Sequence, residues 1–282
     1  MDLIHSILQG KDTYTKDEIW ELTGQIQDLY RTTSNIIQLN TDKVIFVGDL
    51  HGELSSARAV QRYIKDYPDY NFVFLGDYAD RGPQQIETFN LVIALTLAHP
   101  DRITMLRGNH ESDRIAAKYG FYHVVIRSFS SDVFKYYSRV FEVLPIGVYK
   151  KSSFIAVHGG VPEGVSSLED IQSRNRRHPD FPDDVICQIV WNDPKESDFE
   201  FRSSIRGERT RFFGKKAFTE FMENIDAQIM IRAHEVFPNG YKAFFDGRLI
   251  SVFSATYGTR VEPKIVRLSK DHTIEPLPLN AK

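Results

Sequence analysis

Five short apolar segments of the chain each end in residues that can bind a metal ion. The endings are Gly48-Asp49-Leu50-His51-Gly52, Gly76-Asp77-Tyr78-Ala79-Asp80-Arg81-Gly82, Arg107-Gly108-Asn109-His110-Glu111, His158-Gly159-Gly160 and Arg232-Ala233-His234. If the apolar segments are strands of an α/β sheet, their carboxyl ends meet at the edge where ligands bind. Carboxylate, amide and imidazole groups without a thiolate suit Mn, Fe, Zn or Mg better than a structural zinc site.

Each of these endings has an ordinary explanation when it is taken alone. A Gly-Asp pair after a strand is usually a turn, and a single histidine usually packs against its neighbours or faces solvent. Five such endings on five successive strands are not independent of one another, however. Their recurrence predicts one metal centre to which all five strands contribute.

The spacing of apolar residues indicates alternating strands and helices. Strands are expected at 44–47, 72–75, 103–106, 154–157 and 229–231, and helices at 53–65 and 84–98 with further helical segments up to about 142. Strand and hairpin patterns close the chain at 241–245, 249–253 and 264–268. The alternation predicts parallel pairing with helices outside, and the hairpins add an antiparallel part. We therefore predict an α/β protein with two packed mixed β-sheets flanked by helices.

No segment rich in Gly, Ser or Pro divides the chain, so we predict a single domain over residues 1–282. Residues 1–40 are expected to form a helical N-terminal part and residues 41–270 the catalytic core. The first part carries a helix-start signal, because Glu18 follows Thr15 by three positions. It contains no residues in a chemical pattern, so we expect it to pack on the core.

Composition and charge exclude several classes of protein. The 282 residues include 35 Lys and Arg against 38 Asp and Glu, a balance that argues against nucleic acid or a membrane surface as the main partner. The longest apolar run, around 91–98, is far shorter than the ~18–20 residues that span a bilayer. Cys187 is the only cysteine, which excludes an internal disulfide, and no basic signal-peptide segment begins the chain. A cytoplasmic location is expected.

The five endings together resemble the motifs of the phosphoprotein phosphatase family, the protein serine/threonine phosphatases of types one and two-A. Further matching segments are Tyr119-Gly120-Phe121-Tyr122, Val190-Trp191-Asn192-Asp193-Pro194, Arg206-Gly207, Phe213-Gly214 and Phe253-Ser254-Ala255. The resemblance covers the chain from about residue 40 to 268. It implies a calcineurin-like metallophosphoesterase domain with the metallophosphatase fold, in which two packed sheets lie between helices as an αββα sandwich.

The resemblance also implies two divalent metal ions and their ligands. Asp49 and His51 would bind the first ion, and Asp77 would bridge it to the second. The remaining ligands of the second ion would be Asn109, His158 and His234. Manganese is the metal expected in vitro, with Fe, Zn or Mg also suitable. Such a pair holds water as hydroxide for direct in-line attack on a phosphomonoester, so no covalent phosphoenzyme is expected.

The phosphate-binding residues implied by the resemblance are Arg81, Arg206, Asn109 and Tyr257. The two arginines would grip the phosphate oxygens, because the planar guanidinium stays charged and matches phosphate bidentately. Tyr257 stands in a loop, residues 254–258, that is shorter than the loop over the active site of the animal enzymes and lacks their cysteine.

The resemblance makes His110 the general acid that protonates the leaving oxygen, oriented and kept protonated by Asp80. A purely structural pair of Asp80 and His110 is the alternative. The short loop at 254–258 and the short tail after the last predicted strand resemble the compact bacterial and archaeal members of the family. This departure leaves the binding of regulatory subunits open.

The expected function is therefore a metal-dependent serine/threonine phosphatase that acts on phosphoproteins. The alternative is a nucleotide phosphatase similar to the symmetrical diadenosine tetraphosphate hydrolases, which share the first motifs. A catalytically inactive phosphate-binding protein would be missing a ligand, and none is missing. Acidic residues between 183 and 200 weakly favour basic phosphopeptides, and the basic run at 174–178 is expected to be a solvated loop face.

Overall fold

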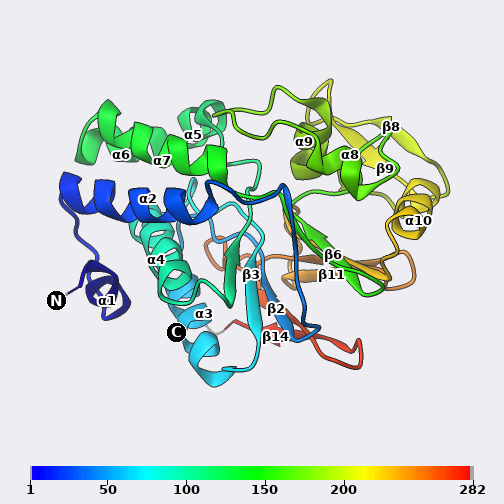
Figure 1. The fold of residues 1–282 in the computed structure, drawn as a ribbon, viewed down its shortest axis with the longest axis horizontal. Helices are drawn as coiled ribbons and strands as arrows, with labels where there is room; N and C mark the ends of the chain where they lie inside the picture. Colours follow the sequence, from blue (N-terminus) through cyan, green and yellow to red (C-terminus); the bar gives the residue numbers. More distant parts are fainter. Residues whose placement is uncertain (1, 280–282) are drawn as a thin grey trace.

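The computed structural model describes residues 2–279 and contains two large sheets packed face to face (Figure 1). The first sheet has the spatial order β14 (Ile274–Pro278), β13 (Lys264–Leu268), β2 (Val44–Val47), β3 (Asn71–Phe74) and β4 (Ile103–Met105). The last three strands are parallel. Their register sets Val47 opposite Phe74 and Phe74 opposite Met105, so their carboxyl ends are level.

The second sheet has the order β1 (Ile36–Gln38), β5 (Gly147–Lys150), β6 (Phe154–Val157), β10 (Ile229–Arg232), β12 (Leu249–Val252) and β11 (Tyr241–Phe244). Strands β6, β10 and β12 are parallel, whereas β5 and β11 run antiparallel to their hairpin partners. A small third sheet consists of β7 (Asp193–Pro194), β9 (Arg211–Phe213) and β8 (Phe201–Ser203). Both large sheets are mixed, as predicted.

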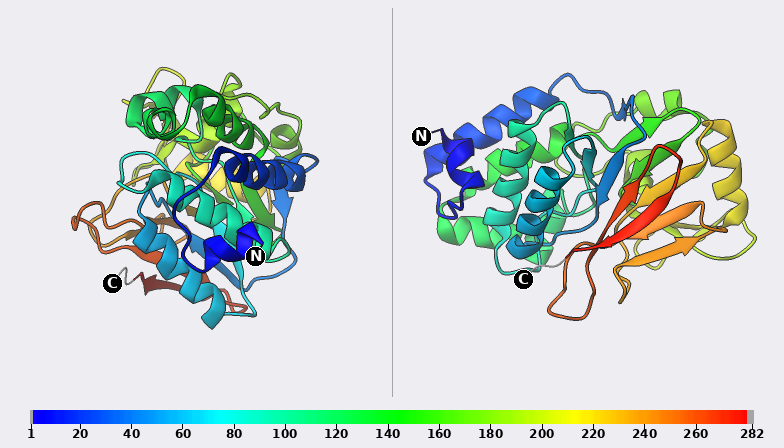
Figure 2. Two further views of the ribbon diagram at one scale, coloured as in Figure 1. Left: turned by 90° about the vertical axis from the view of Figure 1, so that its left-hand side faces the viewer. Right: turned by 90° about the horizontal axis from the view of Figure 1, so that it is seen from below.

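Helices cover the outer faces of the two sheets (Figure 2). The apolar cluster on the outer side of the first sheet includes residues of α1 (Leu3–Leu8), α2 (Lys16–Tyr30), α3 (Leu54–Asp66), α4 (Gln85–Ala98), α5 (Asp113–Tyr119), α6 (Phe121–Ser128) and α7 (Ser131–Val143). The second sheet packs against α8 (Leu168–Gln172), α9 (Asp184–Trp191) and α10 (Lys215–Asn224). No helix within residues 2–279 has the length and apolar character to cross a membrane.

The layer between the sheets consists of apolar side chains from alternate positions of both, a pattern that follows from the two-residue period of a strand. In this layer the rings of Phe46 and Phe154 meet edge to face, with centroids 5.4 Å apart. Neighbouring positions such as Ile45 and Ile155 point outward and pack against the helices. The predicted αββα sandwich is confirmed.

The prediction that residues 1–40 are helical was wrong for the end of this part. The capping box at Thr15 and Glu18 is present and begins α2. Residues 36–38 form β1 instead of a helix and pair in parallel with β5, which buries Ile36. This pairing partner lies more than a hundred residues later in the chain, so helical spacing within the segment could not reveal it.

The basic run at 174–178 is not simply a solvated loop face. Arg176 is only 4% exposed, and its guanidinium donates hydrogen bonds to the carbonyls of Thr33, Val143 and Leu144 and to the side chain of Asn35. Burial of a charged group requires such partners. The arginine therefore ties the segment after α2 to the end of α7.

The two sheets meet where β2 and β12 end. Asp49 and Phe253, just beyond these strands, form a parallel bridge, and the amide of Gly48 donates a hydrogen bond of 2.8 Å to Oγ of Ser254. A Cβ on Gly48 would lie 2.3 Å from the carbonyl oxygen of Val252, so this approach requires glycine. The five predicted strand ends therefore converge from two sheets, three from the first and two from the second.

Candidate active site

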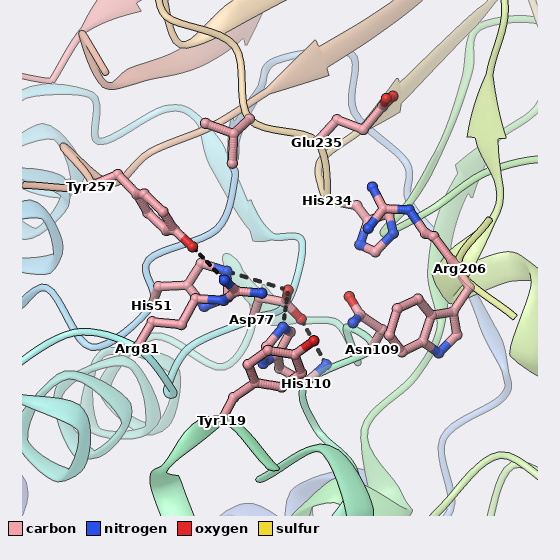
Figure 3. Close-up of a pocket in the computed structure, with 12 residues that line it drawn as sticks. His51, Asp77, Arg81, Asn109, His110, Tyr119, Arg206, His234, Glu235 and Tyr257 are labelled. Carbon is pink, nitrogen blue, oxygen red and sulfur yellow. Dashed lines mark hydrogen bonds and ion pairs between the residues drawn. The ribbon is translucent and has the colours of Figure 1, made fainter. Parts of the chain in front are cut away.

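A pocket of about 300 Å³ opens where the strand ends converge (Figure 3). Among its lining residues are the predicted His51, Asp77, Arg81, Asn109, His110, Arg206, His234 and Tyr257. The other predicted residues, Asp49, Asp80 and His158, are buried behind it and approach side chains of the pocket within 3.5 Å. Figure 3 shows Arg81 and Arg206 on opposite sides, with Asp77 between them. The structure therefore brings all the predicted side chains together.

Asp77 lies at the centre of the possible metal ligands. Its Oδ2 is 3.4 Å from Nε2 of His158, 3.7 Å from Nε2 of His51 and 3.9 Å from Nε2 of His110. Two groups of buried side chains that could hold an ion share Asp77, one with His51 and His110 and one with His158 and His234. A shared carboxylate suits two neighbouring cations, because its charge offsets their repulsion.

A buried carboxylate oxygen next to the first group, from Asp49, is without a hydrogen-bond partner in the described part of the chain. Oδ2 of Asp49 is buried, lies 3.5 Å from Nε2 of His51, and has no hydrogen-bond partner within residues 2–279. Nδ1 of His51 is 3.0 Å from the carbonyl oxygen of Ala79, a contact that fixes the ring and leaves Nε2 facing inward. A buried oxygen and an imidazole nitrogen in this arrangement fit a cation.

The second group is built in the same way. Nδ1 of His158 is 2.9 Å from the carbonyl oxygen of Leu75, so its Nε2 faces Oδ1 of Asn109 at 2.9 Å. The buried Nε2 of His234 has no hydrogen-bond partner in the described part of the chain. Burial and the nearby charge of Arg206 lower the pKa of His234 well below its ordinary value. The ring is therefore neutral, which is the form that binds metal.

The charges of the cluster also fit cations at its centre. Burial lowers the pKa of His51, but the carboxylates of Asp49 and Asp77 more than reverse this and raise it above its ordinary value. The pKa of His158 is raised in the same way, mainly by Asp77. Burial would raise the pKa of Asp77, yet the neighbouring imidazoles hold it well below its ordinary value. Positive charge stabilises the centre, and divalent cations would supply it.

His110 forms a buried pair with Asp80 at the side of the pocket. Nδ1 of His110 is 2.6 Å from Oδ2 of Asp80, and the other carboxylate oxygen accepts a 2.7 Å hydrogen bond from the amide of Phe121. The carboxylate is thus held from two sides and in turn holds the imidazole. A histidine oriented in this way can transfer a proton from Nε2.

The two arginines are each held by a second residue. Nη1 of Arg81 donates a 2.6 Å hydrogen bond to the hydroxyl of Tyr257, and its guanidinium lies 4.6 Å from the ring centre of Tyr119. Nε of Arg206 contacts the carboxylate of Asp193. Both guanidinium groups are therefore oriented without a ligand, on opposite sides of the pocket.

Comparison with known proteins agrees with this geometry. The sequence profile of the calcineurin-like phosphoesterases matches residues 42–238, more than half of the chain. The chain belongs to this family. Two curated relatives of this phosphoesterase are serine/threonine-protein phosphatase 4 catalytic subunits. The one from Eremothecium gossypii is 35% identical over 90% of this chain and 82% of the relative. The one from Saccharomyces cerevisiae is 33% identical over 90% of this chain and 81% of the relative. A protein phosphatase 2A catalytic subunit of Dictyostelium discoideum is 34% identical over 88% of the chain and 79% of that protein. The predicted resemblance to phosphoprotein phosphatases is confirmed.

Solved structures support the same fold for the phosphoesterase. A serine/threonine phosphatase from Saccharomyces cerevisiae, described as similar to human phosphatase PP5, superposes with a TM-score of 0.84 and 25% identity, over 96% of this chain and 92% of the other. A cold-active protein-tyrosine phosphatase from Shewanella gives a TM-score of 0.68 at 15% identity, over 89% and 84% of the two chains. The second likeness concerns the fold alone. The predicted metallophosphatase fold is confirmed.

Glu111 organises the phosphoesterase site, and sequence reasoning gave it no role. Its buried carboxylate accepts hydrogen bonds from the amides of Asp77, Tyr78 and Gly108, at 2.8, 3.1 and 2.8 Å. These contacts join the turn after β3 to the turn after β4 and fix the backbone of Asp77. The signal in the sequence was its place directly after His110.

Asp193 is the second residue that sequence reasoning left without a role. Its carboxylate contacts Arg206 and also accepts a 2.9 Å hydrogen bond from Nη2 of the buried Arg232. The position of Arg206 is therefore set by a residue of the Trp191-Asn192-Asp193-Pro194 segment, which is one of the segments that match the phosphoprotein phosphatases. Tyr119, which lies beside Arg81, comes from another quoted segment.

Several site residues of the phosphoesterase have left-handed backbone conformations that normally favour glycine. The angle φ is +44° at His51, +57° at Asp77, +63° at Asp80, +68° at Arg81 and +51° at Tyr257. Such a conformation costs on the order of 1–3 kcal/mol in a bulky residue and persists only where its surroundings fix it. Here these conformations occur in three loops at the site, after β2, after β3 and after β12.

Proposed function

We propose that this phosphoesterase is a metal-dependent protein serine/threonine phosphatase. The observation that carries the proposal is the arrangement around Asp77. Two ligand groups share its carboxylate, two arginines line the same pocket, and the pair of His110 and Asp80 lies beside it. Binding of a phosphomonoester, orientation of its oxygens and protonation of the leaving group each have a side chain available. The names of the relatives support phosphoproteins as the substrate class.

The proposed ligands are Asp49, His51 and Asp77 for one divalent ion. Those for the other are Asp77, Asn109, His158 and His234. When bound, the ions would supply an activated water and positive charge at the phosphoryl oxygens. Manganese is expected to support activity in vitro, and the same oxygen and nitrogen donors suit Fe, Zn or Mg.

The phosphate-binding side chains are proposed to act from both sides. Arg81 and Arg206 orient the phosphoryl group through bidentate, charge-assisted hydrogen bonds. Asn109 also lines the pocket, and its Oδ1 faces His158, so its amide nitrogen is available to a phosphoryl oxygen. Tyr257 is proposed to complete the site by holding Arg81.

His110 is proposed to protonate the leaving oxygen of the serine or threonine side chain. Its Nδ1 is occupied by Asp80, so the proton is delivered from Nε2, the nitrogen nearer Asp77. An alkoxide is a poor leaving group, and its protonation lowers the barrier. Asp80 acts through His110 and is therefore a positioning residue.

The test uses the purified chain with Mn²⁺ and one peptide sequence that carries phosphoserine, phosphothreonine or phosphotyrosine, with diadenosine tetraphosphate in parallel. The proposal predicts release of phosphate from the phosphoserine and phosphothreonine peptides, abolished by Asp77→Asn. Faster cleavage of the dinucleotide would favour the nucleotide phosphatase. Peptide binding without turnover in the wild type would favour an inactive binding protein.

We also propose that residues 1–282 form one compact domain, with the catalytic core at 41–270. In this respect the chain resembles the compact bacterial and archaeal members of the phosphoprotein phosphatase family. The short loop at 254–258 supports this comparison. A cytoplasmic location is supported by Cys187, whose thiol is free and buried. Phosphoproteins are the proposed partners. Whether the chain also binds regulatory subunits would be tested by purifying the full chain from its host and identifying the proteins that copurify with it.

A further inference from the structure

A second hollow, of about 640 Å³, adjoins the active-site pocket. It lies between α5 and the loop at residues 205–210, and we call it the side groove. Tyr119, Trp191 and Arg206 line both the pocket and the side groove, so the two hollows are next to each other. A polypeptide with its phosphoresidue in the pocket would therefore extend neighbouring residues along this groove.

The side groove carries two cations that have no anionic partner. Arg114 and Lys118 stand four positions apart on α5, so they lie on one face of the helix. Both are exposed, and neither side chain has an ion pair or hydrogen bond within residues 2–279. The ammonium of Lys118 lies 5.3 Å from the ring centre of Tyr119, at the boundary between the groove and the pocket.

Other charges of the groove are already compensated or of opposite sign. Arg209 pairs with Asp184 and donates to the carbonyls of Phe181 and Pro182, while Arg206 is held by Asp193. Glu208 is the single carboxylate among the described lining residues. The free charge along the groove is therefore positive on the α5 side.

This distribution opposes the weak preference for basic peptides suggested by the acidic residues between 183 and 200. Asp184 is paired with Arg209 and Glu200 with Lys216. Asp183 caps α9 through a 3.0 Å hydrogen bond from the amide of Ile186. These carboxylates are therefore engaged in ion pairs or in a helix cap, whereas Arg114 and Lys118 on α5 have no such partner within residues 2–279.

We propose that the side groove binds an acidic side chain of the substrate polypeptide, on one side of the phosphoresidue only. The inference rests on the proposed function and names the substrate class more closely: phosphoproteins with Asp or Glu next to the phosphorylated serine or threonine. Arg114 and Lys118 are its specificity-determining residues. The exposed apolar side chain of Ile205 at the rim would pack against the stem of the bound residue.

The experiment compares peptides of one length that carry phosphoserine flanked by acidic residues on the N-terminal side, acidic residues on the C-terminal side, or neutral residues on both sides. A further peptide replaces the acidic residues with a second phosphoserine, which separates carboxylate from phosphate recognition. We expect kcat/KM to be about three- to tenfold higher for one of the two acidic peptides than for the neutral one, with the advantage declining as salt is added.

The variants are Arg114→Gln, Lys118→Gln and the double variant, with Lys216→Gln on α10 as a control that removes an exposed charge elsewhere. The double variant should lose the preference for the acidic peptide and retain wild-type hydrolysis of p-nitrophenyl phosphate, which does not reach the groove. Arg114→Glu with Lys118→Glu should reverse the preference towards a basic peptide.

Equal kcat/KM for acidic and neutral peptides in the wild type would overturn the inference. A preference that survives in the double variant would also overturn it. A preference only for the doubly phosphorylated peptide would contradict recognition of carboxylates. If none of the phosphopeptides is hydrolysed while p-nitrophenyl phosphate is still cleaved, the proposed function is overturned, and this inference falls with it.

Discussion

The hydroxyl of Tyr257 accepts a 2.6 Å hydrogen bond from Nη1 of Arg81 across the mouth of the active-site pocket. Tyr119 lies against the same guanidinium, so Arg81 is held between two aromatic residues from distant parts of the chain. A side chain that is already ordered loses less entropy when phosphate binds. The short loop at 254–258 therefore contributes to the site by orienting Arg81 through Tyr257, although it supplies none of the proposed metal ligands.

Tyr257→Phe removes this hydroxyl and keeps the ring. We expect kcat/KM for a phosphopeptide to fall about three- to tenfold, roughly 1 kcal/mol, mainly through a higher KM. Steady-state kinetics check the result. The matched control is Tyr63→Phe, which removes a hydroxyl that donates to the carbonyl of Pro278 and should leave KM unchanged. An unchanged KM in Tyr257→Phe would contradict the role of the contact.

Glu53 is expected to act through the same loop. Its carboxylate accepts hydrogen bonds from the amide and the hydroxyl of Thr256, the residue before Tyr257. Glu53→Gln should loosen the loop and raise KM in the same direction as Tyr257→Phe. Because both changes act through Arg81, the double variant should be no worse than the poorer single variant. Additive losses in kcat/KM would show that Glu53 acts by another route.

His110→Asn tests proton donation through the leaving group. For phosphoserine, whose alkoxide needs a proton, kcat should fall about 10²–10⁴-fold. For p-nitrophenyl phosphate, whose leaving group is stable as an anion, the loss should be much smaller. Asp80→Asn should show the same pattern with a smaller loss. Equal losses on both substrates would indicate that His110 only supports the structure.

Gly108→Ala tests the packing of the two turns behind Asp77. A Cβ at this position would lie 2.3 Å from Oδ1 and 2.6 Å from the amide nitrogen of Asp77, where nothing can move without displacing the shared carboxylate. We expect loss of metal binding and a lower melting temperature. In the matched control, Gly24→Ala in α2, the added Cβ meets no atom within 4 Å. That change should stabilise the fold by roughly 0.5–1 kcal/mol and keep activity. Normal metal binding by Gly108→Ala would contradict this account.

The site residues were predictable because their motifs are local. Each strand end carries its own metal-binding residue within a few positions. Asp49, Asp77 and Asn109 can therefore be identified as candidate ligands without knowing which strands pair with one another. The pairing itself was not predictable from these motifs. Strands β2, β3 and β4 lie in one sheet and β6 and β10 in the other, and the two meet through the bridge between Asp49 and Phe253.

The residues that were missed act through backbone groups or through partners far along the chain. Glu111 accepts hydrogen bonds from amides of a turn more than thirty residues earlier, and no side-chain pattern records such contacts. Asp193 lies in β7 and Arg206 in the loop between β8 and β9, so the pairing of the small third sheet is what brings the two residues together. Strand β1 was read as helix because its pairing with β5 lies outside any local window.

The most direct test of the central claim is the metal content of the purified chain after saturation with Mn²⁺ and removal of free ion, measured by elemental analysis together with phosphopeptide hydrolysis. Two ions per chain are expected in the wild type, and Asp77→Asn should lose bound metal and activity together, because both ligand groups share that carboxylate. A fully active chain that holds one ion or none would contradict the account.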